Sequence, residues 1–196
     1  MIEVFDDLLD DETLSVLDRV VKDPLFAWHY NPRSIEGHPD RAKDSPQMVR
    51  SILMDTGSEG HITSYQNELI KKYPEFMNIA WRGLERSKRN FEGIEKFLRI
   101  KVNMTMPFLN APTFNPPHVD TDGEGYMSLV YYLNDSDGDT FFFDDADCFN
   151  SVDDRRVTPK RNRGVMFDAY HRHSSSSPKE TRRRLIINSV FKPIGG

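Results

Sequence analysis

Hydrophobic positions follow a helical period in the first half of the chain. Apolar residues recur there every three or four positions, as they do on one face of a helix. Three stretches show this pattern: Leu14, Leu17, Val20 and Val21; then Ile62, Tyr65, Leu69 and Tyr73; then Phe76, Ile79, Ala80, Gly83 and Leu84. We therefore predict three helices, the first capped by Asp10 or Asp11 and ended by Asp23-Pro24.

The period changes to two from residue 97 onward. Leu98, Ile100, Val102 and Met104 then share one face of a strand, and Arg99, Lys101, Asn103 and Thr105 share the other. Further strands are predicted at residues 2–5, 127–134, 140–143, 164–168 and 184–191. Helices followed by many short strands indicate an α+β protein whose core is a barrel-like or double-sheet jelly roll.

Residues 26–47 show no steady period. The segment contains Trp28 and three prolines, so we predict irregular structure. A loop of this length is uncommon unless it has a function, such as covering a site. Two interpretations stay open: a lid over the substrate, or a structural excursion anchored by Trp28.

Length, cysteine content and charge narrow the class of protein. A chain of 196 residues suits one domain with a substantial buried core. The single cysteine, Cys148, excludes an internal disulfide and favours a reducing compartment. The N-terminus lacks signal-peptide features, no apolar run reaches the ~20 residues of a membrane span, and the net charge of −5 offers nucleic acid no general attraction. We expect a cytoplasmic protein that acts on neither membranes nor nucleic acid.

The sequence His118-Val119-Asp120 is a candidate metal site. The prolines before it favour extended backbone, and on such backbone both side chains point the same way. A third ligand must come from His171 or His173, which share a face on a regular strand. Two imidazoles and one carboxylate form the facial triad of non-haem Fe(II) oxygenases. Because three ligands plus water also describe catalytic zinc, a metal-binding jelly-roll protein without oxygenase activity is the alternative.

Several motifs together resemble a known family. They are residues 115–120, Leu-Val-Tyr-Tyr-Leu-Asn at 129–134, Gly-Asp-Thr at 138–140, Gly-Val-Met-Phe at 164–167, His173, and Arg-Leu-Ile-Ile-Asn at 184–188. In this order they resemble the Fe(II)/2-oxoglutarate-dependent dioxygenase superfamily, in the prolyl-hydroxylase-like branch with its bacterial and phage members. The resemblance implies a single domain over residues 1–196, with helical support at about 10–95 and a double-stranded β-helix (jelly-roll) core at about 97–191.

The resemblance also implies a set of site residues. His118, Asp120 and His173 would hold iron, with His173 preferred to His171 because of its spacing from Phe167 and Pro178, and the serine run 174–177 would form a turn. Arg184 would bind the far carboxylate of 2-oxoglutarate, since a guanidinium offers a planar fork of donors. Tyr132 rather than Tyr131 would add a hydroxyl, and Asn103 would bond the keto-acid end. Gly138 stands alone where many relatives have two glycines, which leaves the geometry of that turn open.

The expected activity is hydroxylation of a C–H bond with Fe(II), dioxygen and 2-oxoglutarate, releasing succinate and carbon dioxide. Ascorbate could stimulate such an enzyme. Peptidyl proline is the first candidate substrate, and a small molecule or free amino acid is the second.

Overall fold

The structure is a computed structural model that describes residues 1–33, 44–55, 64–143 and 155–196. In chain order its elements are β1 (Ile2–Phe5), α1 (Asp11–Lys22), β2 (His29–Asn31), β3 (Gln47–Met54), α2 (Ser64–Lys72), α3 (Glu75–Arg86), β4 (Phe91–Thr105), β5 (Met127–Tyr132), β6 (Thr140–Phe142), β7 (Arg156–Val157), β8 (Arg163–Asp168), β9 (His173–Ser175) and β10 (Arg184–Gly195). No helix within these ranges has both the length and the apolar character that crossing a membrane requires.

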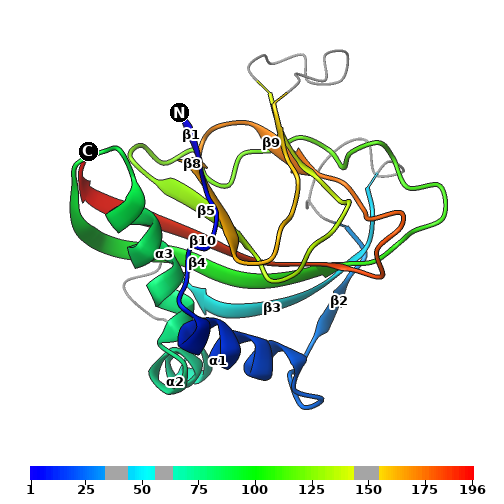
Figure 1. Cartoon of the computed structure of the whole chain (residues 1–196), viewed down its shortest axis with the longest axis horizontal. Coiled ribbons are helices and arrows are strands. Elements are labelled where there is room, and N and C mark those ends of the chain that lie inside the picture. The colour runs from blue at the N-terminus through cyan, green and yellow to red at the C-terminus, as the bar shows by residue number, and fades with distance from the viewer. Residues whose placement is uncertain (34–43, 56–63, 144–154) are drawn as a thin grey trace.

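The strands form two antiparallel sheets. The larger has the order β1-β8-β5-β10-β4-β3-β2, and the smaller has the order β7-β6-β9. The three helices lie together on one side of the larger sheet, and β9 lies on the other side (Figure 1). The α+β class and the two-sheet jelly roll with N-terminal helices are confirmed.

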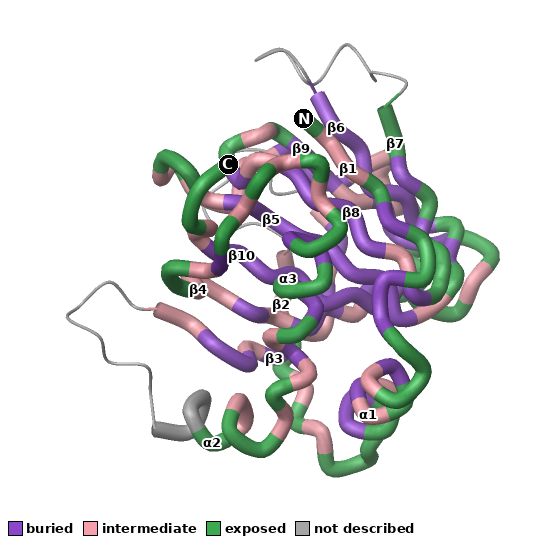
Figure 2. The backbone as a smooth tube through the Cα atoms, turned by 60° about the vertical axis from the view of Figure 1, so that its left-hand side comes forward, coloured by how far each residue is buried: buried purple, intermediate pink, exposed green. Residues whose placement is uncertain are grey.

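Most buried hydrophobic residues of the described ranges fall into two clusters, and a third, small cluster contains Phe141 and Phe143. One, between the larger sheet and the helices, contains Ile100 and Val102 of β4 with Phe76 and Ile79 of α3. The other contains Tyr132, Phe142 and Phe167 from strands of both sheets. The central strands are accordingly buried along most of their length (Figure 2). The polar face of β4 points away from the helices and lines the cavity between the sheets.

The predicted helices and most predicted strands are present. Helix α1 has Asp10 as its N-cap, with Oδ1 accepting a 2.8 Å hydrogen bond from the backbone N–H of Thr13. Helices α2 and α3 match the second and third helical patterns, although Ile62 lies outside the described residues. Strand β4 begins at Phe91, earlier than predicted, and β10 runs on to Gly195.

Two predictions of irregular structure were wrong. Residues 29–31 form the edge strand β2, which pairs with β3, a strand that the pattern did not predict. Ser174 and Ser175 belong to β9 instead of a turn, because they pair with Phe141 and Thr140 of β6. Sheet pairing here outweighs local propensity. The proposed lid over residues 26–47 includes residues 34–43, which lie outside the described residues.

Candidate metal centre and co-substrate site

His118, Asp120 and His173 converge on one point. One ligand atom from each of them lies within 4.8 Å of the others. The convergence depends on backbone pairing, since His118 and His173 each donate an N–H to the other's carbonyl oxygen at 2.9 Å. A second backbone hydrogen bond, from Asp120 N–H to the Ala169 oxygen at 2.9 Å, aligns the other end of the segment. The expected extended backbone is therefore present at the His-x-Asp motif.

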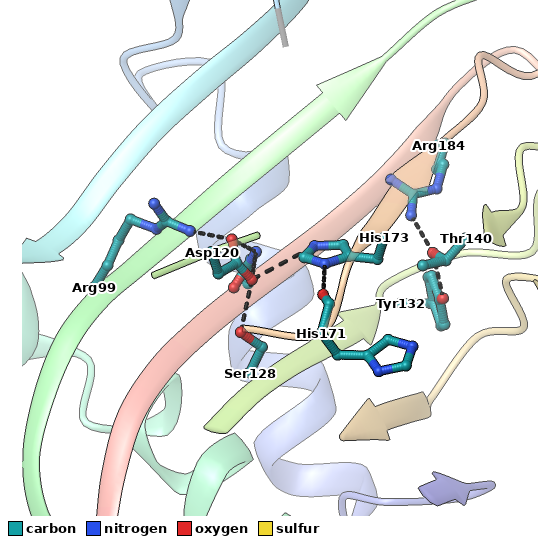
Figure 3. Close-up of polar contacts among 9 residues, drawn as sticks. Arg99, Asp120, Ser128, Tyr132, Thr140, His171, His173 and Arg184 are labelled. Atoms are coloured by element: carbon teal, nitrogen blue, oxygen red, sulfur yellow. Dashed lines mark hydrogen bonds and ion pairs between the residues drawn. The ribbon is translucent and has the colours of Figure 1, made fainter. Parts of the chain in front are cut away.

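Each of the two imidazoles presents a ring nitrogen to the site. Burial, followed by the neighbouring His173, lowers the pKa of His118 to about 3, so its ring is uncharged at neutral pH. His173 Nδ1 lies 2.9 Å from the carbonyl oxygen of His171. A carbonyl only accepts, so Nδ1 carries the proton and Nε2 keeps its lone pair. That Nε2 lies 3.6 Å from Asp120 Oδ2 (Figure 3).

Asp120 is anionic and tightly oriented. Its side chain is 2% exposed. Oδ1 accepts a 2.5 Å hydrogen bond from Arg99 Nη2, and Oδ2 accepts one of 2.7 Å from Ser128 Oγ (Figure 3). Burial alone would raise the pKa of this carboxyl, but the Arg99 guanidinium and the hydrogen bond from Ser128 oppose burial, and the pKa is held well below its usual value. An anionic carboxylate beside two imidazole nitrogens suits a divalent cation.

The two histidines that sequence alone left open are now separated. His173 joins the triad, whereas the His171 ring is turned away from Asp120 (Figure 3) and packs 5.8 Å from the Phe142 ring. His171 still supports the site through the carbonyl that fixes the His173 ring.

Arg184 and Thr140 line the same cavity, and Tyr132 contacts both of them. Arg184 is 4% exposed and donates a 2.7 Å hydrogen bond from Nη2 to Thr140 Oγ1, which is also 2.7 Å from the Tyr132 hydroxyl. The Arg184 Cζ atom lies 5.6 Å from the centre of the Tyr132 ring. Burial lowers the pKa of Arg184, but a guanidinium stays protonated. Burial also raises the pKa of Tyr132, which therefore remains a neutral phenol able to donate.

The neighbours of these residues have other roles. Arg182 and Arg183 are exposed. Tyr131 faces the helix-side cluster, where its hydroxyl donates to Asn162 Oδ1 at 2.9 Å. Asn103 does line the cavity, with Nδ2 donating to Gln47 Oε1 at 2.7 Å.

Four residues of the site were not predicted: Arg99, Ser128, Thr140 and Asn188. Arg99 shares a face with Asn103, so the period of its strand indicated that Arg99 also faces the site. Thr140 closes the Gly-Asp-Thr motif, which offered another signal. Asn188 closes the Arg-Leu-Ile-Ile-Asn motif, whereas Ser128 carried no signal, since it looks like an ordinary strand residue.

A single cavity of about 240 Å³ joins the triad to Arg184. Within the described residues, Arg184 Nε and Asn103 Oδ1 are buried without hydrogen-bond partners. A buried donor without a partner is costly, and a carboxylate would satisfy it. The nitrogen and oxygen ligands and this unpaired guanidinium donor fit an Fe(II) ion together with 2-oxoglutarate.

Comparison with known proteins agrees with this geometry. Residues 105–192 match the sequence model of the 2OG-Fe(II) oxygenase superfamily. No curated protein shows significant similarity to the chain.

Solved structures with the same fold are numerous, at low sequence identity. A 2OG-Fe(II) oxygenase family oxidoreductase from Burkholderia pseudomallei is 14% identical, with a TM-score of 0.63 over 100% of this chain and 86% of that one. A Pseudomonas putida prolyl-4-hydroxylase is 17% identical, with a TM-score of 0.52 over 99% and 93%. The epimerase SnoN, solved with Fe3+, alpha ketoglutarate and nogalamycin RO, is 13% identical, with a TM-score of 0.56 over 97% and 78%. These three likenesses concern the fold.

Proposed function

We propose that this chain, which belongs to the 2OG-Fe(II) oxygenase superfamily, acts as a single domain that hydroxylates an unactivated C–H bond of its substrate. In the same turnover 2-oxoglutarate yields succinate and carbon dioxide. The observation that carries the proposal is the cavity that holds both a two-histidine, one-carboxylate cluster and a buried arginine with an unsatisfied donor.

His118, Asp120 and His173 would hold Fe(II), which supplies the oxidising chemistry when dioxygen binds to it. The chain positions these ligands before metal arrives. Arg99 and Ser128 orient the Asp120 carboxylate, and the His171 carbonyl orients His173. Ligands whose partners fix them lose little freedom when the ion binds.

Arg184 would bind the far carboxylate of 2-oxoglutarate, helped by the hydroxyls of Tyr132 and Thr140. The register between β10 and β4 places these groups in order along the cavity. Arg184 lies opposite Thr105, Ile186 opposite Asn103, and Asn188, 3.3 Å from Asp120, opposite Lys101. Asn103 therefore lies between the arginine and the triad, where its free Oδ1 or its amide could contact the keto-acid end.

The unsatisfied donor argues against the alternative of a zinc site without oxygenase activity. Three ligands and a water complete a catalytic zinc site. Such a site needs no buried guanidinium beneath it. Peptidyl proline remains the first candidate substrate, supported by the fold of the Pseudomonas putida prolyl-4-hydroxylase, and a small molecule or free amino acid remains the second.

The decisive experiment measures both co-substrate binding and turnover. At ~100 times its dissociation constant, 2-oxoglutarate should stabilise the metal-loaded protein by about 2.7 kcal/mol. Arg184→Met should lose that protection, and Arg183→Met, which removes an exposed neighbouring charge, should keep it. Succinate release should require Fe(II), and ascorbate is predicted to stimulate it.

Equal protection of wild type and Arg184→Met would contradict the assignment of Arg184. Absence of both protection and iron-dependent succinate would contradict the oxygenase function. Proline-rich peptides that gain the mass of one oxygen atom would identify the first candidate substrate.

A further inference from the structure

Lys101 is a cation in the cavity that the proposed reaction does not use. The described residues lining the cavity include three cations, Arg99, Lys101 and Arg184, and one carboxylate, Asp120. Arg184 serves the co-substrate, and Arg99 already contacts Asp120. Lys101 has no hydrogen bond or ion pair within the described part of the chain.

The register places Lys101 beside the metal and away from Arg184. Lys101 lies opposite Asn188, whose amide is 3.3 Å from Asp120 Oδ2. Arg184 lies opposite Thr105, four residues further along β4. At about 3.3 Å per residue this separates the two levels by roughly 13 Å along the strands. The far carboxylate of 2-oxoglutarate, bound at Arg184, is therefore out of reach of Lys101.

Keeping a lysine at this position is unfavourable without an anion. Burial, followed by the charge of Arg99, lowers the pKa of Lys101 to about 8, although the charge of Asp120 opposes both. Lys101 is half-buried and lines the cavity without a partner among the described residues, so an anion that enters the cavity can pair with its ammonium group.

The charge balance of the loaded site also favours an anionic substrate. Iron and the three cations outweigh Asp120 and a 2-oxoglutarate dianion by two positive charges. A substrate that brought an anion next to the metal would reduce this excess. A proline inside a peptide carries no charge beside its reacting carbon, whereas a free amino acid or small carboxylic acid does.

Resting on the proposed function, we propose that Lys101, with Arg99 beside it, binds the carboxylate of a small substrate, so that the enzyme oxidises a free amino acid or similar carboxylic acid. The carboxylate would occupy the side of the metal opposite the co-substrate's anchor. Its distance from Lys101 would then select which carbon of the substrate faces the iron.

The test compares acids with their uncharged counterparts. The probes are the proteinogenic L-amino acids, their N-acetyl derivatives and their carboxamides, titrated against protein holding Mn(II) and saturating 2-oxoglutarate. At least one acid should bind, and its carboxamide should bind at least ~10-fold more weakly, because charge-assisted hydrogen bonds are about twice as strong as neutral ones. The same acid should stimulate succinate release by the iron-loaded enzyme.

Substitutions at Lys101 test whether this residue binds the acid. Lys101→Met should weaken binding of that acid by at least ~10-fold and leave 2-oxoglutarate affinity within about threefold. Lys101→Arg should bind the acid better than Lys101→Met does, because it retains the charge. Lys96→Met is the matched control, since Lys96 is exposed on the same strand. If Lys101→Met does not fold, the binding of the acid and of its carboxamide is compared on wild type and on Lys101→Arg. Weaker binding of the carboxamide to both proteins is then the expected result.

Three outcomes would overturn the inference: carboxamides or proline peptides binding as tightly as acids, no acid binding at all, or Lys101→Met losing 2-oxoglutarate instead of the acid. Wild-type protein that 2-oxoglutarate does not stabilise would instead indicate that the proposed function has failed.

Discussion

Arg184 Nη2 donates a 2.7 Å hydrogen bond to Thr140 Oγ1, and both residues are buried. Thr140→Val keeps the shape of the side chain but leaves Arg184 Nη2 and the Tyr132 hydroxyl without this partner. We predict about tenfold weaker 2-oxoglutarate binding, measured by calorimetry, because a buried donor left unpaired costs about 1–3 kcal/mol. Thr113→Val, at an exposed loop position, should bind 2-oxoglutarate as wild type does. Unchanged affinity in Thr140→Val would show that Thr140 does not support Arg184.

Gly138 permits this arrangement by lacking a side chain. A Cβ atom at this position would lie 2.7 Å from the Ser176 carbonyl oxygen and 3.1 Å from Arg184 Cδ. Gly138→Ala should therefore displace one of them, lowering the melting temperature and 2-oxoglutarate affinity together. Gly93→Ala is the control, because its Cβ would make ordinary contacts of 3.6 Å with Trp81. Equal behaviour of the two alanine variants would contradict the close approach.

Asp137 stabilises the turn that leads into β10. Its carboxylate accepts hydrogen bonds from the backbone N–H groups of residues 179–181 at 2.8–3.1 Å and from the Thr181 hydroxyl at 2.6 Å. Burial alone would raise the pKa of Asp137, but these hydrogen bonds outweigh it and lower the pKa well below its usual value.

The depressed pKa fixes the sign of a pH dependence. The carboxylate stabilises the fold above the unfolded pKa of about 3.9, and that contribution is lost as pH falls toward the lower folded value. Asp137→Asn should lower the melting temperature at pH 7 by about 2–4 °C, which corresponds to about 1 kcal/mol in a chain of this size. The difference from wild type should shrink as the pH falls below about 4. Asp122→Asn, in an exposed loop, should show neither effect.

His171 and His173 make a matched pair for metal binding. His173→Ala removes a ligand, so Fe(II) affinity under nitrogen should fall by at least ~100-fold. His171→Ala keeps the backbone carbonyl that orients His173, so its affinity should stay within about tenfold of wild type. If His171→Ala weakened Fe(II) binding more than His173→Ala did, His171 would be the third ligand.

Asp120→Glu separates metal binding from coupled turnover. It keeps the charge but places the carboxylate one methylene further from the backbone. Fe(II) binding should largely survive, whereas substrate hydroxylation should fall by at least ~10²-fold, as expected when reacting groups are misplaced by about 1 Å. Unchanged turnover would mean that Asp120 is not the facial carboxylate.

Local patterns in the sequence were sufficient for the architecture and for part of the site. Period-two alternation separated the helix-facing Ile100 and Val102 from the cavity-facing Lys101 and Asn103, because a strand can present only two faces. His118 and Asp120 were found together for the same reason. The edge strand β2 was not predicted, because its three residues show no alternation. Their structure comes from pairing with β3.

Only the tertiary structure decided which distant groups meet. Alternation treats His171 and His173 alike, and β9 distinguishes them by beginning at His173, where the backbone pairs with His118. Arg99 belongs to the site because β4 brings it to Asp120, and Thr140 belongs to it because β6 brings it to Arg184. Neither contact can be predicted from the residues next to it in the sequence. Periodicity reports the face on which a side chain lies. The pairing of strands far apart in the chain determines what that face meets. At this site it brings together three candidate metal ligands, a buried arginine, and a lysine that has no partner among the described residues.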